Sequence, residues 1–163
     1  FWAPLVELYY FEKIGKRKSW VVPTQLVGCC ILFYLSFYIV EMLLEKQVYK
    51  LTGFLILNTF VITCQDIAVG SWAVEILHPS NSSYASASQS VGQSLGKIMS
   101  TTVFIALNSI EFCNKWIFET PQQDPLLSIP QFIFLWAFVQ MMITLYILMF
   151  VPEKIKVQDE SAF

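Results

Sequence analysis

Hydrophobic residues fill four long stretches of the chain, and each stretch is nearly free of charge. The stretches cover residues 21–44, 51–77, 84–107 and 132–151. A helix needs roughly 20 mostly apolar residues to cross a bilayer. Because backbone groups in lipid must be satisfied within the protein, helices are the form that such stretches take. The pattern predicts an all-α, polytopic membrane helix bundle with four full spans.

The few charges within these stretches are unevenly distributed. The first stretch meets only Glu41, near its end, and the last has no charge. The second stretch holds Asp66 and Glu75, and the third, which is poorer in large apolar residues, holds Lys97. We expect Glu75 to be solvated, because it lies near the end of its span.

The remaining segments are short. Residues 1–11 have the pattern of the end of another span, because the chain opens on apolar residues without a Met, so we expect a piece of a longer membrane protein. Residues 108–130 form the one long connection, which is too short for a separate domain. Of the four cysteines, we expect only Cys113, in this connection, to meet solvent.

Composition supports lipid as the solvent and excludes several functions. Hydrophobic residues make up 56% of the 163 residues and charged residues 13%, whereas a soluble domain carries about a quarter charged residues. The chain has ten basic and 12 acidic residues, so it lacks the excess of positive charge that binds nucleic acid. The sequence has no metal-ligand spacing, nucleophile elbow or catalytic carboxylate pair, so we expect neither an enzyme nor a cofactor.

The positive charges predict the orientation. Short cytosolic loops are enriched in Lys and Arg, and six of these residues flank the four spans at the two ends of the chain, against three in the loops of the other side. Both ends are therefore expected in the cytosol. The sequon Asn81-Ser82-Ser83 falls in a loop that this topology places in the cytosol, so a glycan there would contradict the orientation.

Two stripes run along the third stretch at a spacing of four residues, which places the members of each on one side of a helix. The first consists of small residues and predicts a face for close helix packing: Ser88, Gly92, Gly96 and Ser100. The second lies about 100° around the helix and is polar: Gln89, Gln93, Lys97 and Thr101.

The polar stripe has two explanations. One is interhelical hydrogen bonding, which holds many membrane bundles together. The other is a water-filled cavity, which Lys97 favours because a charge at a helix centre costs roughly 2.5–3.5 kcal/mol and a structural lysine would lie nearer the interface. We interpret Lys97, Gln93, Gln89 and Gln65 as candidate substrate contacts. Asp66 is a candidate for ion or proton coupling and the expected acidic partner of Lys97.

Ordered sequence blocks resemble a known family over nearly the whole chain. The blocks are Trp2-Ala-Pro-Leu-Val-Glu7, Gly15-Lys-Arg-Lys-Ser-Trp20, Val22-Pro-Thr-Gln25, Gln65-Asp-Ile-Ala-Val69, Trp72-Ala73, Tyr84-Ala-Ser86, Ser90-Val-Gly-Gln93 and Glu111-Phe-Cys-Asn-Lys115. In order and spacing they resemble the acetyl-coenzyme A transporter family of the major facilitator superfamily. A weaker resemblance, through the Gln-Asp-Ile-Ala core, is to bacterial muropeptide permeases.

The resemblance implies a secondary transporter that works by alternating access, of which this chain holds the end of the second helix through the sixth. It implies a multi-pass protein of the endoplasmic reticulum membrane that carries acetyl-CoA from cytosol to lumen, with CoA as a candidate exchange partner. The remainder of the same bundle would complete the site.

One loop in particular resembles a superfamily feature, the acid-plus-basic loop that helps to set the conformational equilibrium. Its residues are Glu7, Gly15, Lys16, Arg17 and Lys18. Positive-inside anchoring explains the same charges, and the two readings are compatible.

The chain also departs from the family pattern. Gly70-Ser71-Trp72 stands where the pattern has Asp-Gly-Trp, and Lys97 stands where an aromatic residue is expected. These changes remove an anion and add a cation, which suits the phosphates of CoA or a different anionic substrate. The sequence thus leaves open a transporter of another amphipathic anion or muropeptide-like solute, and a four-span scaffold that moves no solute.

Overall fold

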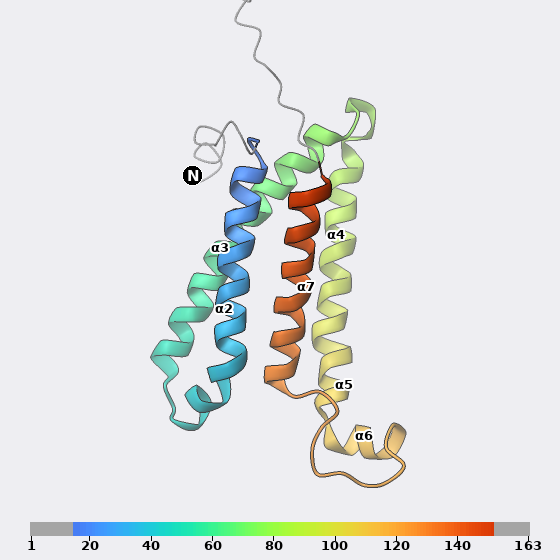
Figure 1. Cartoon of the computed structure of the whole chain (residues 1–163). Helices are drawn as coiled ribbons and strands as arrows, with labels where there is room; N and C mark the ends of the chain where they lie inside the picture. Colours follow the sequence, from blue (N-terminus) through green and yellow to red (C-terminus); the bar gives the residue numbers. More distant parts are fainter. Residues whose placement is uncertain (1–14, 152–163) are drawn as a thin grey trace, which may run out of the picture.

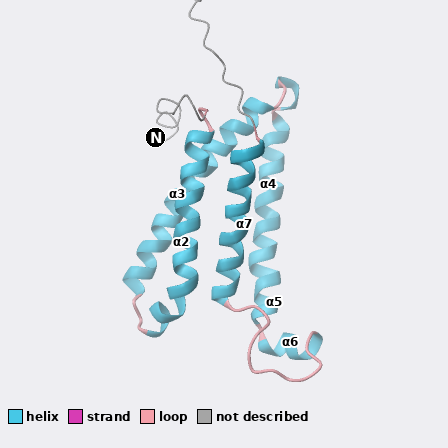
Figure 2. Ribbon diagram, in the orientation of Figure 1, coloured by secondary structure: helices cyan, strands magenta, loops and turns pink. Residues whose placement is uncertain are grey.

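A computed structural model describes residues 15–151 of the chain (Figure 1). The described backbone consists of helices joined by loops and contains no strand (Figure 2). The elements are α2 (Lys18–Leu44), α3 (Val48–Ile76), the 3-10 turn η1 (Pro79–Asn81), α4 (Ser83–Ile98), the π turn η2 (Met99–Val103), α5 (Phe104–Asn108), α6 (Ile110–Trp116) and α7 (Ile129–Phe150).

Three of the described helices, α2, α3 and α7, are long and apolar enough to cross a membrane. The predicted all-α membrane bundle is therefore confirmed. The third predicted span coincides with a continuous rod, α4–η2–α5, which runs beside α7 (Figure 1). At about 1.5 Å per residue the rod is long enough to span, but it is more polar than the other three, and its crossing remains a prediction.

The ends of α2 are formed by local backbone chemistry. Gly15 has a φ of 105°, which favours glycine, and its carbonyl accepts the backbone N–H and the hydroxyl of Ser19 at 3.1 and 2.5 Å. At the other end Lys46 has a φ of 55°, and the N–H of Gln47 reaches back to Met42 O at 2.9 Å. This is the Schellman arrangement, and it turns the chain tightly into α3.

Helix α2 lies between α3 and α7 and contributes to two apolar clusters. The first is built on Val21, Ala68 and Trp72, toward the start of α2. The second, toward the other end, contains Leu35 and Val61 among its buried residues. Burial of these side chains joins the three long helices into one packed unit.

A polar layer separates the two clusters. The side-chain amide of Gln140, at the middle of α7, donates to the backbone carbonyl of Gln25 on α2 at 3.2 Å, and the buried Thr144 hydroxyl donates to Gln140 O at 2.8 Å. Gly28 makes room for the amide, because a Cβ at this position would lie 2.9 Å from Gln140 Nε2. The absence of a side chain at Gly28 thus allows α2 and α7 to be joined by a hydrogen bond within the bundle.

The α5 end of the rod is attached to the start of α7 and to the loop that precedes it. The rings of Phe104 and Phe132 stack with centroids 4.3 Å apart. The side-chain amide of Asn108 donates to Leu127 O at 2.9 Å, and Leu127 N–H donates to Leu107 O at 3.1 Å. These contacts fix α5 and the chain that leads into α7.

The long connection is partly helical, because it contains α6. Cys113 on α6 is fully buried, and its thiol lies 3.3 Å from Leu107 O. The expectation that this cysteine meets solvent is therefore wrong. The reason is that α6 folds back against the end of α5, a local packing that the polar, proline-rich sequence of the connection did not reveal.

Substitution of Gly28 by Val should destabilise the bundle by roughly 1–3 kcal/mol, the usual cost of overpacking a core. The new methyl groups would displace the Gln140 amide and press on Val61, whose Cγ1 lies 3.7 Å from the place that a Cβ at position 28 would take. Thermal unfolding of the purified full-length parent in detergent measures the effect. Gly53→Val is the matched control, since nothing lies within 4 Å of a Cβ at Gly53, and equal losses for the two variants would contradict the close approach.

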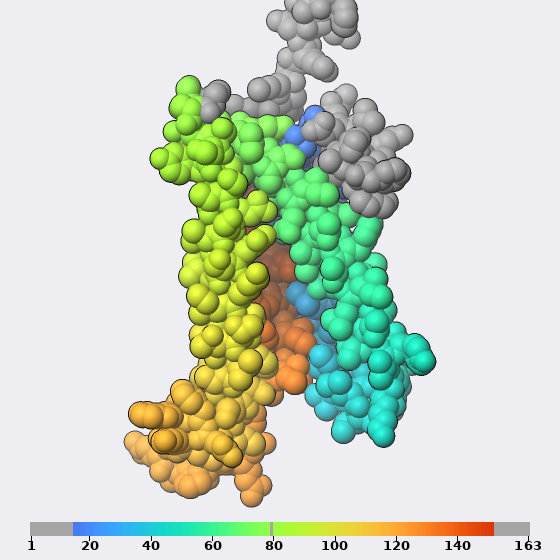
Figure 3. All heavy atoms as spheres, turned by 180° about the vertical axis from the view of Figure 1, so that it is seen from behind, coloured from blue at the N-terminus to red at the C-terminus, as the bar shows by residue number. Residues whose placement is uncertain are grey.

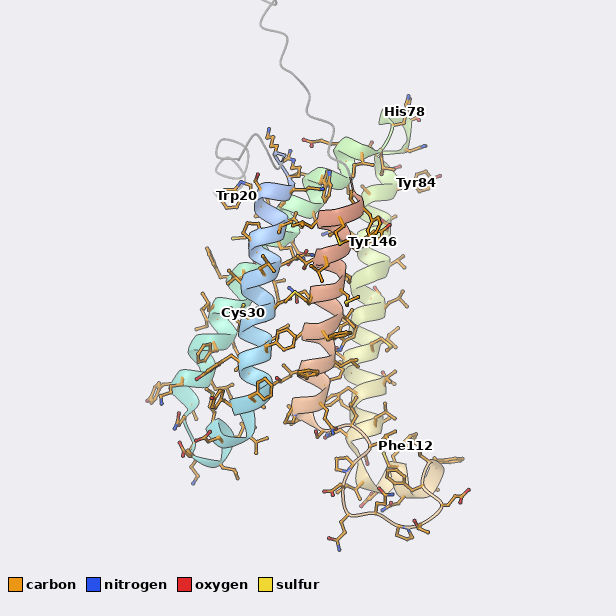
Figure 4. All side chains as sticks on the ribbon, viewed as in Figure 1. Trp20, Cys30, His78, Tyr84, Phe112 and Tyr146 are labelled. Atoms are coloured by element: carbon orange, nitrogen blue, oxygen red, sulfur yellow. The ribbon has the colours of Figure 1, made fainter. Side chains whose placement is uncertain are left out.

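The topology gives a second prediction. Both ends of the described chain lie at the same end of the bundle as the η1 loop (Figure 1), and Trp20 and His78 mark that end, opposite Phe112 (Figure 4). If that end is cytosolic, Asn81 stays unglycosylated in cells. Phe118→Asn, which creates a sequon with Thr120 in the opposite loop, should gain an endoglycosidase-sensitive mass shift. The reverse pattern would overturn the orientation.

Candidate functional site

Helix α4 exposes nearly its whole length, and several of its serine hydroxyls bond to its own backbone. Of its residues only Ala85 is buried. The hydroxyls of Ser88 and Ser94 donate to carbonyls one turn earlier at 2.9 and 2.8 Å. These bonds remove the hydroxyls from the set of groups that need a partner elsewhere.

The other polar side chains of the predicted polar stripe are different. Gln89, Gln93 and Lys97 are exposed, and they form no side-chain hydrogen bond or ion pair within residues 15–151. An amide or ammonium group cannot remain unpartnered against hydrocarbon without a large cost. These three side chains therefore require water, a solute or another part of the protein.

The C-terminal part of α3 lies close to the polar stripe of α4. A Cβ at Gly70 would lie 3.8 Å from Gln89 Oε1, so the two helices are neighbours there. Away from this point α3 and α4 diverge and leave a hollow, with α7 and α2 visible behind it (Figure 3). Asp66 is exposed and, one helical turn from Gly70, lies on the same side of α3.

Two further expectations concern Gln65 and the pairing of Asp66 with Lys97. Gln65 is half-buried beside Asp66. No ion pair joins Asp66 to Lys97 in the described part of the chain, so the expected partnership is not formed. Asp66 on α3 and Lys97 on α4 thus belong to the two helices that border the hollow, but they are not paired.

The small-residue stripe has no partner helix among residues 15–151. Nothing lies within 4 Å of a Cβ placed on Gly92 or Gly96, and Ser88 and Ser100 are exposed. The packing role of this face stays a prediction, and its partner would have to come from outside the described residues.

An ion pair that the sequence analysis missed joins α2 to α3. The Arg17 guanidinium donates to both oxygens of Glu75, with Nη2–Oε1 at 2.5 Å and Nε–Oε2 at 3.1 Å. The Arg17 side chain is 3% exposed and that of Glu75 46%. The expectation that Glu75 is merely solvated is wrong. Two antiparallel helices of similar length bring the start of one beside the end of the other, which is the signal that could have identified the pair.

The other residues of the predicted conformational loop share this location. Gly15, Lys16 and Lys18 flank Arg17 at the start of α2, whereas Glu7 lies outside the described residues. Within residues 15–151, no group of three His, Cys, Asp or Glu side chains could hold a metal ion.

Comparison with known proteins identifies the family. The sequence profile of the family described as acetyl-coenzyme A transporter 1 matches residues 1–162. The chain belongs to this transporter family. The sequence resemblance is thereby confirmed over nearly the whole length.

Two fungal proteins described as uncharacterised are relatives of this member of the acetyl-coenzyme A transporter family. A membrane protein of Saccharomyces cerevisiae is 31% identical over 94% of the chain and 30% of its own length. A protein of Schizosaccharomyces pombe is 34% identical over 84% of the chain and 27% of its own length. The chain thus spans less than a third of these relatives, and no solved structure matches it.

Neutralising Glu75 should weaken the α2–α3 connection. Because the Glu75 carboxylate is partly exposed, solvent screening limits the expected loss for Glu75→Gln to about 1 kcal/mol. Thermal unfolding of the purified full-length parent measures it. Glu41→Gln removes an exposed acid near the other end of α2 and serves as the control, and equal shifts for both variants would show that the ion pair contributes nothing.

Proposed function

We propose that the full-length parent carries acetyl-CoA across the endoplasmic reticulum membrane, from cytosol to lumen, by alternating access as a member of the major facilitator superfamily. Family membership supports the substrate class. The observation that carries the proposal is the set of exposed, unpartnered polar side chains on α4: Gln89, Gln93 and Lys97.

The chemistry of these side chains fits a polyanionic solute. Acetyl-CoA carries a pyrophosphate and a further phosphate, and an ammonium group binds phosphate as a point charge. Lys97 supplies that charge. Gln93 and Gln89 lie one and two turns along the same side of α4 and provide amides that donate and accept hydrogen bonds. Gln65, on the facing helix, is the fourth proposed contact.

Asp66 is the proposed coupling group. It is an exposed carboxylate within the span α3, and intramembrane acids commonly mark ion or proton pathways. Since Lys97 does not neutralise it in this structure, Asp66 is available to bind a proton or cation. Exchange against CoA is the alternative mode that needs no such group.

The Arg17–Glu75 ion pair is the proposed conformational contact. It ties the start of α2 to the end of α3 at the end of the bundle that we place in the cytosol, together with Gly15, Lys16 and Lys18. A change in access that separates these helix ends would have to break the pair.

One observation favours a second substrate. Gly70 contributes no acid beside Gln89, and Lys97 adds a cation, so the hollow is less negative than the family pattern implies. Another amphipathic anion, or a muropeptide-like solute, is therefore the second candidate.

Uptake of labelled acetyl-CoA into proteoliposomes that contain the full-length parent tests the proposal. We expect saturable uptake that free CoA inhibits and acetate does not. Uptake that competes with other amphipathic anions but not with CoA would establish the second candidate. If well-folded protein takes up none of these solutes, the remaining alternative is a scaffold that moves no solute.

Replacing Lys97 by Met should raise the KM for acetyl-CoA about tenfold, because a hydrogen bond to a charged group is lost. Lys97→Arg should retain part of the affinity. Lys50→Met, which removes an exposed lysine from the first turn of α3, is the control and should leave uptake unchanged. An unaltered KM after Lys97→Met would exclude Lys97 as a contact.

A further inference from the structure

We infer that the π turn η2, held by the hydroxyls of Ser100 and Thr101, is a positioning element that sets which side of α4 faces the hollow. The inference rests on the proposed function for its consequence in transport. Its structural part is that the two hydroxyl groups determine the direction in which Lys97 points. This part can be tested without a transport assay.

The π turn interrupts an otherwise α-helical rod. The Phe104 N–H bonds to the carbonyl of Met99, five residues earlier, whereas an α-helix uses the fourth. Single π turns of this kind are rare and are frequently found at functional sites. A π turn accommodates one additional residue, so the segments on its two sides are rotated relative to a continuous α-helix.

Two hydroxyls converge on one carbonyl at this turn. Ser100 Oγ and Thr101 Oγ1 donate to Lys97 O at 3.2 and 2.7 Å. Back-bonding of this kind distorts the regular backbone ladder. The third hydroxyl of the turn, on Thr102, forms no hydrogen bond with the described residues. Both hydroxyl bonds therefore end on Lys97, which lies two residues before the turn and is a proposed substrate contact.

The rod has contacts with neighbouring helices on both sides of the π turn. Before the turn, α4 meets α3 where Gln89 lies beside Gly70. After it, α5 is fixed by the Phe104–Phe132 stack and the Asn108 bond to Leu127. Between these points the surface of α4 is open in this structure, as the empty space beside its two glycines shows. Rotation of α4 at η2 would therefore have to replace the contact between Gln89 and Gly70, but it meets no described neighbour beside Gly92 or Gly96.

The size of the rotation gives the turn its significance. Conversion of the π turn to α geometry rotates α4 relative to α5 by about 100°, the angle of one α-helical residue. The polar stripe and the small-residue stripe of α4 are separated by the same angle. The conversion would therefore turn the polar stripe into the direction that the small-residue stripe now holds, so that Gln93 and Lys97 would take the directions of Gly92 and Gly96.

The experiment measures the distance between spin labels on Gln93→Cys and Ile105→Cys, one on each side of η2, in the full-length parent with its native cysteines replaced. Removing both hydroxyls with Ser100→Ala and Thr101→Val should shift the α and π populations about fivefold for each hydrogen bond lost. We expect a second distance in the distribution, several Å from the first, because labels rotated by about 100° separate by that amount.

Two control variants separate positioning from a general loss of structure. Thr102→Val removes a hydroxyl of the same turn that bonds to nothing described, and Thr101→Ser keeps the hydroxyl. Both should retain the single distance of the parent. In uptake assays Thr101→Val should raise the KM for acetyl-CoA with little change in kcat, and Thr101→Ser should restore it.

An unchanged distance distribution in the double variant, or an equal change in Thr102→Val, would overturn the inference. If the parent moves no acetyl-CoA but the double variant changes the distance, the proposed substrate fails while the positioning element stands. If uptake is normal and the distance does not respond, the positioning element fails while the transporter stands.

Discussion

The structure depends on one constraint, the cost of leaving polar groups unsatisfied in a bilayer. The polar side chains within the helices meet it in three ways. The hydroxyls of Ser88 and Ser94 bond to their own helix, and the Gln140 amide bonds across to α2. Gln93 and Lys97 have no partner among residues 15–151, so they mark the place where water, a solute or the remainder of the bundle must enter.

The same constraint divides the described bundle into two parts with different roles. Helices α2, α3 and α7 share two apolar clusters, and the Gln140 bond and the Arg17–Glu75 pair add directional contacts between them. The rod that contains α4 is attached mainly at its ends. The described bundle thus consists of a packed three-helix unit and a polar helix that buries little of its own surface.

The helix bundle and the polar stripe could be predicted from the sequence, because both depend on composition and on residue spacing. Long apolar stretches were enough to predict the bundle, because a continuous apolar stretch of about 20 residues satisfies its backbone in lipid as a helix. The four-residue spacing placed Gln89, Gln93 and Lys97 on one side of a helix, where the structure has them. Their exposure is shared by nearly the whole of α4, because this helix has few neighbours among the described residues.

The features that were missed depend on tertiary register or local geometry. The partner of Glu75 is 58 residues away in sequence and becomes apparent only when α2 and α3 are aligned. The burial of Cys113 depends on a seven-residue helix folding against α5. The π turn differs from an α turn by one residue, which hydrophobic periodicity does not resolve, although the adjacent Ser100 and Thr101 are residues that bond back to the helix.

We expect the polar stripe of α4 to face an aqueous path that the substrate enters. The most direct test labels Gln93→Cys and Leu95→Cys, which lie about 200° apart around the helix, with a charged, membrane-impermeant thiol reagent in the full-length parent lacking its other cysteines. We expect rapid labelling at position 93, slowed by acetyl-CoA, and little labelling at position 95. Equal labelling at both positions, or labelling at 93 that acetyl-CoA does not slow, would contradict it.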